Sequence, residues 1–198
     1  EGIDKVIKFL RESDYFTSPA STKGHMSVPG GLAIHSYITY KVLKDLIEQS
    51  GIKVNRDSII LIALLHDICR KKEEETGLCH ASEGSKLAPK ILKELNFSEE
   101  KIKNVVHCIE VHRFSKGLKP LTKEARILQD ADRLDAIGAI AITRIISHNT
   151  MIGNPVYDPT IKPSEEYTSK GKTALNHFFE KIFKLKPETF HTCLAKEI

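Results

Sequence analysis

Helical periodicity runs through most of this 198-residue chain and constrains its fold more than any other feature. Apolar residues recur at helical spacing, and no segment has the apolar–polar alternation of a half-buried strand. Asp57 or Ser58 can cap the third helix, and Pro89 marks a kink or a break in the fourth. The pattern predicts an all-α protein with helices over residues 3–11, 32–50, 57–69, 81–95, 98–113 and 122–148, and a helical region from about residue 165 to the end that breaks near Pro187.

Composition and charge exclude several classes of protein. With 40% hydrophobic and 28% charged residues, the chain has the composition of a folded globular protein. We expect one domain (residues 1–198), with a core over about residues 25–150 and a C-terminal helical extension over about residues 160–198. The net charge of +4 comes from interspersed charges of both signs, which disfavours nucleic acid as a partner.

The termini and cysteines bear on location. No apolar run is long enough to cross a bilayer, and the N-terminus has no secretory signal, although residues upstream of Glu1 could be missing. Four cysteines without C-x-x-C spacing suit a reducing compartment. We therefore expect a cytoplasmic protein without a membrane partner.

The apolar run "IILIALLHDICRKK" ends in His66 and Asp67, followed by three cations. A carboxylate at the buried end of a helix needs a partner, because a charge removed from water is costly without one. A bound cation would supply that partner.

Two other expected helices carry polar residues within apolar surroundings. His35 lies in the second helix, where a lone histidine is more often a satisfied core residue than a ligand. The sixth helix contains Asp130, Asp132 and Asp135, which could instead form helical salt bridges such as Asp130–Arg133. Two imidazoles and two carboxylates around one ion would suit manganese, iron, cobalt, nickel, magnesium or zinc.

The order His, His-Asp, Asp on three different helices is much more specific than any single motif. In "GGLAIHS", "LLHDICR" and "QDADRLDAIGA" the chain resembles the HD-domain metal-dependent phosphohydrolase superfamily, whose signature is H…HD…D on a helical bundle. Over about residues 25–186 it is similar to a subgroup of small stand-alone HD hydrolases that includes nucleotide pyrophosphohydrolases. The resemblance implies His35, His66, Asp67 and Asp132 as metal ligands, with one of the two aspartates able to orient or deprotonate a water.

The chain departs from one branch of that superfamily. Enzymes that hydrolyse guanosine tetraphosphate carry an acidic pair a few residues after the HD motif, where this chain has Arg70, Lys71 and Lys72. Acids follow only at residues 73–75, which we interpret as solvated surface. The departure disfavours an alarmone substrate and leaves the general base unidentified.

Four further residues are candidates for the site. His80, His107 and His112 could bind a second metal, act as a general acid or bind phosphate, and otherwise would be surface or supporting histidines. Arg70 could hold a phosphate bidentately or simply complement a helix end.

These features together favour a metal-dependent phosphohydrolase whose substrate is a small phosphorylated molecule, with a nucleotide preferred. Pyrophosphate release from a nucleoside triphosphate is the leading reaction, ahead of phosphomonoester and then cyclic phosphodiester hydrolysis. The alternative is a non-catalytic HD domain that keeps its metal and senses a nucleotide or binds a partner. The oligomeric state stays open.

Overall fold

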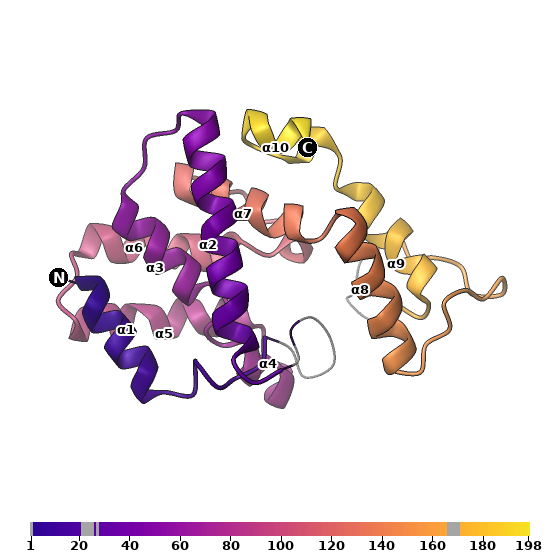
Figure 1. The fold of residues 1–198 in the computed structure, drawn as a ribbon, viewed down its shortest axis with the longest axis horizontal. Coiled ribbons are helices and arrows are strands. Elements are labelled where there is room, and N and C mark those ends of the chain that lie inside the picture. The colour runs from indigo at the N-terminus through magenta and orange to yellow at the C-terminus, as the bar shows by residue number, and fades with distance from the viewer. Residues whose placement is uncertain (1, 21–25, 27, 166–170) are drawn as a thin grey trace.

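The computed structural model describes residues 2–20, 26, 28–165 and 171–198, and within them the chain is helical without a strand, as expected. Figure 1 shows a bundle of helices on one side and a smaller pair, α8 and α9, on the other. The α-helices are α1 (Gly2–Glu12), α2 (Gly31–Ser50), α3 (Arg56–Leu65), α4 (Arg70–Thr76), α5 (His80–Glu94), α6 (Glu99–Val111), α7 (Lys123–Asp135), α8 (Gly138–Met151), α9 (Ala174–Glu180) and α10 (Cys193–Glu197). Short 3₁₀ turns lie at η1 (Phe114–Lys116), η2 (Ile182–Lys184) and η3 (Pro187–Thr189).

We call α1–α7 together with α10 the helical bundle, because α10 returns to pack against α2. We call residues 138–165 and 171–184 the C-terminal lobe, in which α8 packs against α9. The division of the chain near residue 150 that we expected stays a prediction.

Capping residues explain where several helices start. Ser98 accepts a hydrogen bond from the backbone N–H of Lys101, and Thr122 accepts one from that of Ala125. Both starts agree with the sequence pattern. The cap of α3 is different from the expected Asp57 or Ser58, because Asn55 accepts from the N–H of Ser58.

The structure differs from two of the expected helices. The third helix ends at Leu65 instead of Cys69, and a separate helix, α4, includes residues 73–75, which we had interpreted as solvated surface. The long sixth helix is two helices, α7 and α8, because the chain turns at Gly138, whose φ of 80° does not continue a helix. Pro89 lies inside α5 without ending it.

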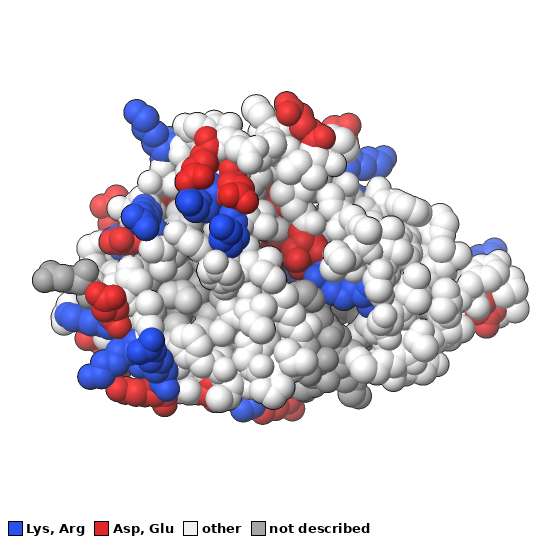
Figure 2. Space-filling model, viewed as in Figure 1, with Lys and Arg blue, Asp and Glu red and all other residues white. Residues whose placement is uncertain are grey.

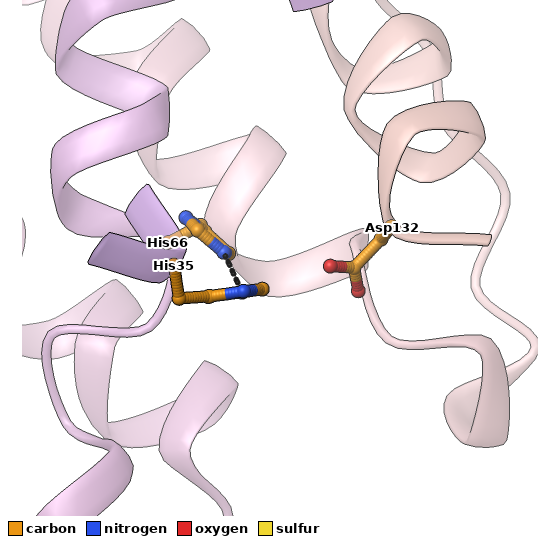
Figure 3. A group of neighbouring side chains, drawn as sticks. All are labelled: His35, His66 and Asp132. Atoms are coloured by element: carbon orange, nitrogen blue, oxygen red, sulfur yellow. Dashed lines mark hydrogen bonds between the residues drawn. The ribbon is translucent and has the colours of Figure 1, made fainter. Parts of the chain in front are cut away.

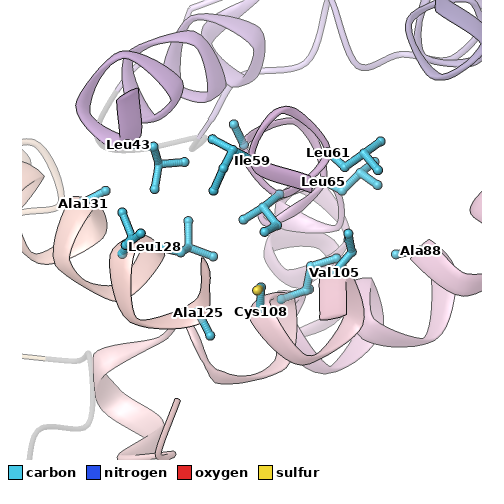
Figure 4. Close-up of a cluster of buried hydrophobic side chains, with 14 of the residues drawn as sticks. Leu43, Ile59, Leu61, Leu65, Ala88, Val105, Cys108, Ala125, Leu128 and Ala131 are labelled. Carbon is cyan, nitrogen blue, oxygen red and sulfur yellow. The ribbon is translucent and has the colours of Figure 1, made fainter. Parts of the chain in front are cut away.

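The core lies where α2, α3, α6 and α7 meet. Figure 4 shows Leu43, Ile59, Leu65, Val105 and Leu128 packed together, and all five are at most 3% exposed. This packing fixes the ends of α2 and α3 relative to α7, and these helices carry or end next to His35, His66 and Asp132.

Candidate metal centre and adjoining cavity

His35 enters the site from the first turns of α2, which begins at a tight approach of the backbone. Gly30 is left-handed with a φ of 78°, and a Cβ on Gly31 would lie 1.9 Å from the backbone oxygen of Met26. Only glycine fits at such a contact. This turn leads directly into the start of α2, and His35 follows it as a buried residue.

His66 and Asp67 lie directly after the last residue of α3, and both are buried. The Nδ1 atom of His66 lies 3.0 Å from the backbone oxygen of Ala63, and because a carbonyl only accepts, that nitrogen carries the proton. Burial lowers the pKa of His66 to about 4, so the ring is neutral near pH 7. Its Nε2 atom then presents a lone pair, as a metal ligand must.

The first candidate group consists of His35, His66 and Asp132, whose ligand atoms lie within 4.8 Å of one another. Figure 3 shows the two imidazoles side by side, with the carboxylate of Asp132 facing them from α7. The two Nε2 atoms are 3.2 Å apart. Two nitrogens that bind one ion at about 2.1 Å and at angles between 90° and 110° lie about 3.0–3.4 Å apart, so this spacing fits a shared ion.

The second candidate group consists of Asp67, His80 and His112, all buried. The Nε2 atoms of His80 and His112 are 3.1 Å apart, and they lie 2.9 and 3.5 Å from Oδ1 of Asp67. The other carboxylate oxygen of Asp67 lies 3.6 Å from Nε2 of His35. Asp67 thus joins the two groups, and the four ligands that the resemblance implied are divided between them.

The outward-facing nitrogens of these histidines are held by acceptors. Nδ1 of His112 donates to the backbone oxygen of Ile109 at 2.7 Å, and Nδ1 of His80 donates to Oε2 of Glu73 at 2.6 Å. Metal-binding histidines are typically held in this way, because the acceptor fixes the tautomer and turns the other nitrogen inward. The donor set of both groups therefore fits a divalent cation.

Charge in the site is concentrated on Asp67. Burial would raise the pKa of Asp67, but the charges of His80 and His66 and the hydrogen bonds from His112 and His80 outweigh burial and hold the pKa well below its usual value. Burial would likewise lower the pKa of His80, yet the carboxylates of Asp67 and Glu73 raise it. The site therefore keeps its central carboxylate ionised.

Glu73 is a site residue that the sequence interpretation missed, since we had assigned it to solvated surface. Its carboxylate receives Arg113 at 2.6 Å and Arg70 at 3.1 Å, besides His80. Burial would raise the pKa of Glu73, but the hydrogen bond from His80 and the charges of Arg113 and Arg70 lower it to about 2. The sequence offered one signal for this contact: Glu73 lies three residues after Arg70, and residues at that spacing on a helix are neighbours.

A cavity of about 390 Å³ adjoins both groups. Helical-bundle residues of the site line it, and so do residues of α8, of α9 and of the segment after α9. The lining includes His35, Asp67, Arg70, His80, His112, Arg113, Asp132, Arg144, His148, His177 and Lys181. Figure 2 shows acidic and basic side chains next to each other at the junction of the bundle and the C-terminal lobe. The cavity is thus built from segments far apart in sequence.

The structure does not bring every candidate into this site. His107 lies outside the cavity lining, and its Nε2 accepts the backbone N–H of Leu121 at 2.9 Å. Asp130 is fully buried away from both groups and accepts the backbone N–H groups of His191 and Thr192. Asp135 pairs with Arg144, with Oδ2 3.0 Å from the guanidinium.

Two further observations concern features outside the site, namely the cysteines and the length of the apolar helices. The four cysteines are free thiols. In the part of the chain that the structure describes, none of the helices is both long and apolar enough for a membrane span.

Comparison with known proteins places the chain in a family. The sequence profile of the HD domain family matches residues 32–137. Protein YpgQ of Bacillus subtilis is 30% identical over 173 residues, which cover 83% of this chain and 75% of YpgQ. A structure of YpgQ in complex with ADP aligns with 100% of this chain and 87% of its own, at 23% identity and a TM-score of 0.63.

Two other relatives carry named activities. The structure of an HD-superfamily hydrolase from Bacillus thuringiensis is 33% identical and has a TM-score of 0.62, and the alignment covers 98% of this chain and 85% of that one. The dihydroneopterin 2′,3′-cyclic phosphate phosphodiesterase of Methanocaldococcus jannaschii is 29% identical over 189 residues, which cover 84% of this chain and 73% of that enzyme. The profile match spans more than half of the chain and includes His35, His66, Asp67 and Asp132. The chain therefore belongs to the HD domain family and is a phosphohydrolase of the HD superfamily.

Proposed function

We propose that this protein is a metal-dependent hydrolase of nucleotides, with release of pyrophosphate from a nucleoside triphosphate as its main reaction. One observation carries the proposal: a cavity of about 390 Å³ is lined both by histidine and aspartate ligands suited to a divalent cation and by several cations. A cavity of this size is within the range of small-molecule sites. The structure of YpgQ in complex with ADP supports a nucleotide as the ligand of an HD protein similar to this one.

The candidate ligands divide into two groups that share Asp67 as their link. His35, His66 and Asp132 would hold one ion, and Asp67, His80 and His112 either complete its coordination or hold a second. A divalent cation at such a site acts as a Lewis acid toward a phosphoryl oxygen and lowers the pKa of bound water.

The remaining side chains would bind and orient the substrate. Arg70 and Arg113 line the cavity and are themselves held by Glu73, so their guanidinium groups are positioned before a phosphate arrives. Positioned cations next to a phosphoryl group stabilise the charge that develops on it during transfer. Apolar side chains such as Ile145, Ile182 and Leu185 also line the cavity, and they suit a base or sugar.

A second reaction is supported by the relative from Methanocaldococcus jannaschii, which is a cyclic phosphate phosphodiesterase. Opening of a 2′,3′-cyclic phosphate needs the same Lewis acid and the same activated water, but it yields a phosphomonoester and no pyrophosphate. The products therefore separate the two reactions.

The test is a substrate panel with chelated and Mn(II)-reloaded protein, in which orthophosphate, pyrophosphate and ring-opened monoester are measured separately. The panel uses wild type, Asp132→Asn and the control Asp45→Asn, whose aspartate is exposed on α2. We expect Mn(II)-dependent pyrophosphate release that Asp132→Asn loses and Asp45→Asn keeps. If the monoester is the sole product, the substrate is a cyclic phosphodiester instead of a nucleoside triphosphate. Absence of every product in all conditions would contradict hydrolysis of nucleotides.

A further inference from the structure

The C-terminal lobe contributes its own cations to the cavity that holds the candidate metal ligands. Arg144 comes from α8 and Lys181 from the end of α9, and both line the cavity together with His35, Asp67 and Asp132. They stand outside the H…HD…D signature, and the function proposed above assigns them no role.

Arg144 is held in place by Asp135. Its NH1 atom lies 3.0 Å from Oδ2 of Asp135, and its NH2 atom donates to the backbone oxygen of the same residue. Asp135 is the last residue of α7 and Arg144 lies in α8, so this pair fixes the guanidinium where the bundle meets the lobe. A guanidinium presents several N–H donors in one plane, a geometry that suits a phosphate.

Lys181 has a different electrostatic setting. Burial lowers the pKa of Lys181, the carboxylate of Asp132 raises it, and the charges of Arg70, Arg144 and Arg113 lower it again. The ammonium therefore shares one cavity with these three guanidinium groups and with that of Arg133. Arg133, by contrast, donates to Gln129 and to the backbone of Thr189 and lies against the ring of Phe114.

Cations that face one cavity from opposite walls repel one another, and an anion between them relieves that repulsion. Arg70 and Arg113 stand on the bundle side, next to Glu73, whereas Arg144 and Lys181 stand on the lobe side. A chain of two or three phosphates carries more negative charge than a single phosphate, so it can pair with more of these cations. The arrangement thus suits a polyphosphate more than an isolated phosphate.

We infer that Lys181 and Arg144 bind the outer phosphates of the substrate and make the site select substrates by their number of phosphates. The inference rests on the proposed function, because it needs a nucleotide whose first phosphate lies at the metal ligands. It assigns Lys181 and Arg144 to specificity, and it places the determinant in the C-terminal lobe instead of the HD motif.

The test is a binding series with Mn(II)-loaded protein in isothermal titration calorimetry. The probes are a nucleoside triphosphate with a methylene bridge between its α- and β-phosphates, the corresponding methylene diphosphate, and the monophosphate. The proteins are wild type, Lys181→Met and Lys186→Met, a matched control that removes the same charge from an exposed lysine outside the cavity. Turnover of a nucleoside triphosphate by wild type is measured in parallel.

We expect wild type and Lys186→Met to bind the three probes in the order triphosphate, diphosphate, monophosphate. Lys181→Met should lose about tenfold or more in triphosphate affinity and at most about threefold for the monophosphate, because one charge-assisted contact is removed. Thermal unfolding checks that the variant is folded, and Lys181→Gln is measured instead if Lys181→Met is not.

Two outcomes would overturn the inference. One is an unchanged order and affinity in the folded Lys181 variant, and the other is a wild type that binds all three probes equally. If wild type nevertheless hydrolyses the triphosphate, the proposed function stands. Only the role of Lys181 and Arg144 in selecting substrates by their number of phosphates then fails. If no nucleotide is turned over, the proposed function fails irrespective of the binding series.

Discussion

The carboxylate of Asp67 lies among three imidazoles, and its buried position at the end of α3 makes chemical sense only with positive charge around it. One oxygen faces His80 and His112, and the other faces His35. A divalent cation would provide this charge without requiring that several neighbouring histidines be protonated at once. Glu73 then matters because it holds His80 from outside the group.

Glu73→Gln should weaken metal binding while leaving every candidate ligand in place. The Nδ1 atom of His80 donates to Glu73 at 2.6 Å, and a neutral amide would no longer increase the electron density of the ring. We expect the affinity for Mn(II) to fall about 10- to 100-fold, which is typical when an acceptor behind a metal-binding histidine is removed. Calorimetric titration of chelated protein measures it.

The control for this change is Glu75→Gln, since Glu75 lies exposed on the same helix. Glu75→Gln should bind Mn(II) like wild type. Equal Mn(II) affinity in the Glu73 and Glu75 variants would mean that Glu73 plays no part in positioning His80.

The lowered pKa of Glu73 also predicts how the stability of the metal-free protein changes in acid. The pKa of Glu73 is about 2 in the fold against an ordinary 4.5, so the folded state binds the proton more weakly than the unfolded state. Its contribution to the free energy of unfolding is therefore present above pH 4.5 and is lost as the pH falls through about 2. We expect wild type to exceed Glu73→Gln by about 2–3 kcal/mol at pH 7.

Urea unfolding of the chelated proteins between pH 7 and pH 2.5 measures this difference, which should shrink steadily below pH 4.5. A difference that stays constant over the whole range would show that the charge of Glu73 does not stabilise the fold.

The residues of the site differ in how visible they are from the sequence. His66 and Asp67 stand out because a polar pair ends an apolar run, and Asp132 because it interrupts another. Glu73 is one of three adjacent glutamates, and its contact with His80 depends on how α4 packs against α5. A tertiary contact of this kind leaves no local signature.

At the scale of elements, the break between α7 and α8 forms the cavity. One continuous helix over residues 122–148 would carry Arg144 away from the bundle, whereas the turn at Gly138 brings α8 beside the metal ligands. Apolar residues surround this turn on both sides, so helical periodicity continues across it and hides it from a sequence pattern. Caps such as Ser98 and Thr122 were predictable because they act locally.

Gly138→Ala tests that turn. Gly138 has a φ of 80°, and a Cβ there would meet no atom within 4 Å, so the cost of the substitution is one of backbone conformation alone. We expect a loss of about 1–2 kcal/mol in the free energy of unfolding. Gly138→Asn should lose less, because asparagine tolerates the left-handed region better than alanine.

Urea unfolding of the three proteins gives the comparison. Equal stability of wild type and Gly138→Ala would mean that the chain does not need a left-handed residue at this turn.

At the scale of the whole molecule, the metal ligands connect segments that are far apart in sequence. His35 comes from α2, His66 from the end of α3 and Asp132 from α7, while His80 and His112 belong to α5 and the end of α6. An ion that binds all of these segments in the folded state, and none of them together in the unfolded chain, stabilises the entire bundle.

We therefore expect Mn(II) to raise the melting temperature of chelated wild type. At one hundred times its Kd, a ligand of the folded state contributes about 2.7 kcal/mol, which corresponds to about 5–10 °C for a chain of this size. Asp45→Asn should keep the shift, since that residue is exposed and remote from both groups. Asp132→Asn and Asp67→Asn should each reduce the shift if the two groups hold metal together.

The pattern across the two variants locates the stabilising ion. A shift lost only in Asp132→Asn would place that ion with His35 and His66, and a shift lost only in Asp67→Asn would place it with His80 and His112. A full shift in both variants would contradict the assignment of either group, because an ion bound elsewhere would then stabilise the fold. The melting temperature of the bundle thus measures metal binding without any substrate. This separates the test of the metal centre from the test of the reaction.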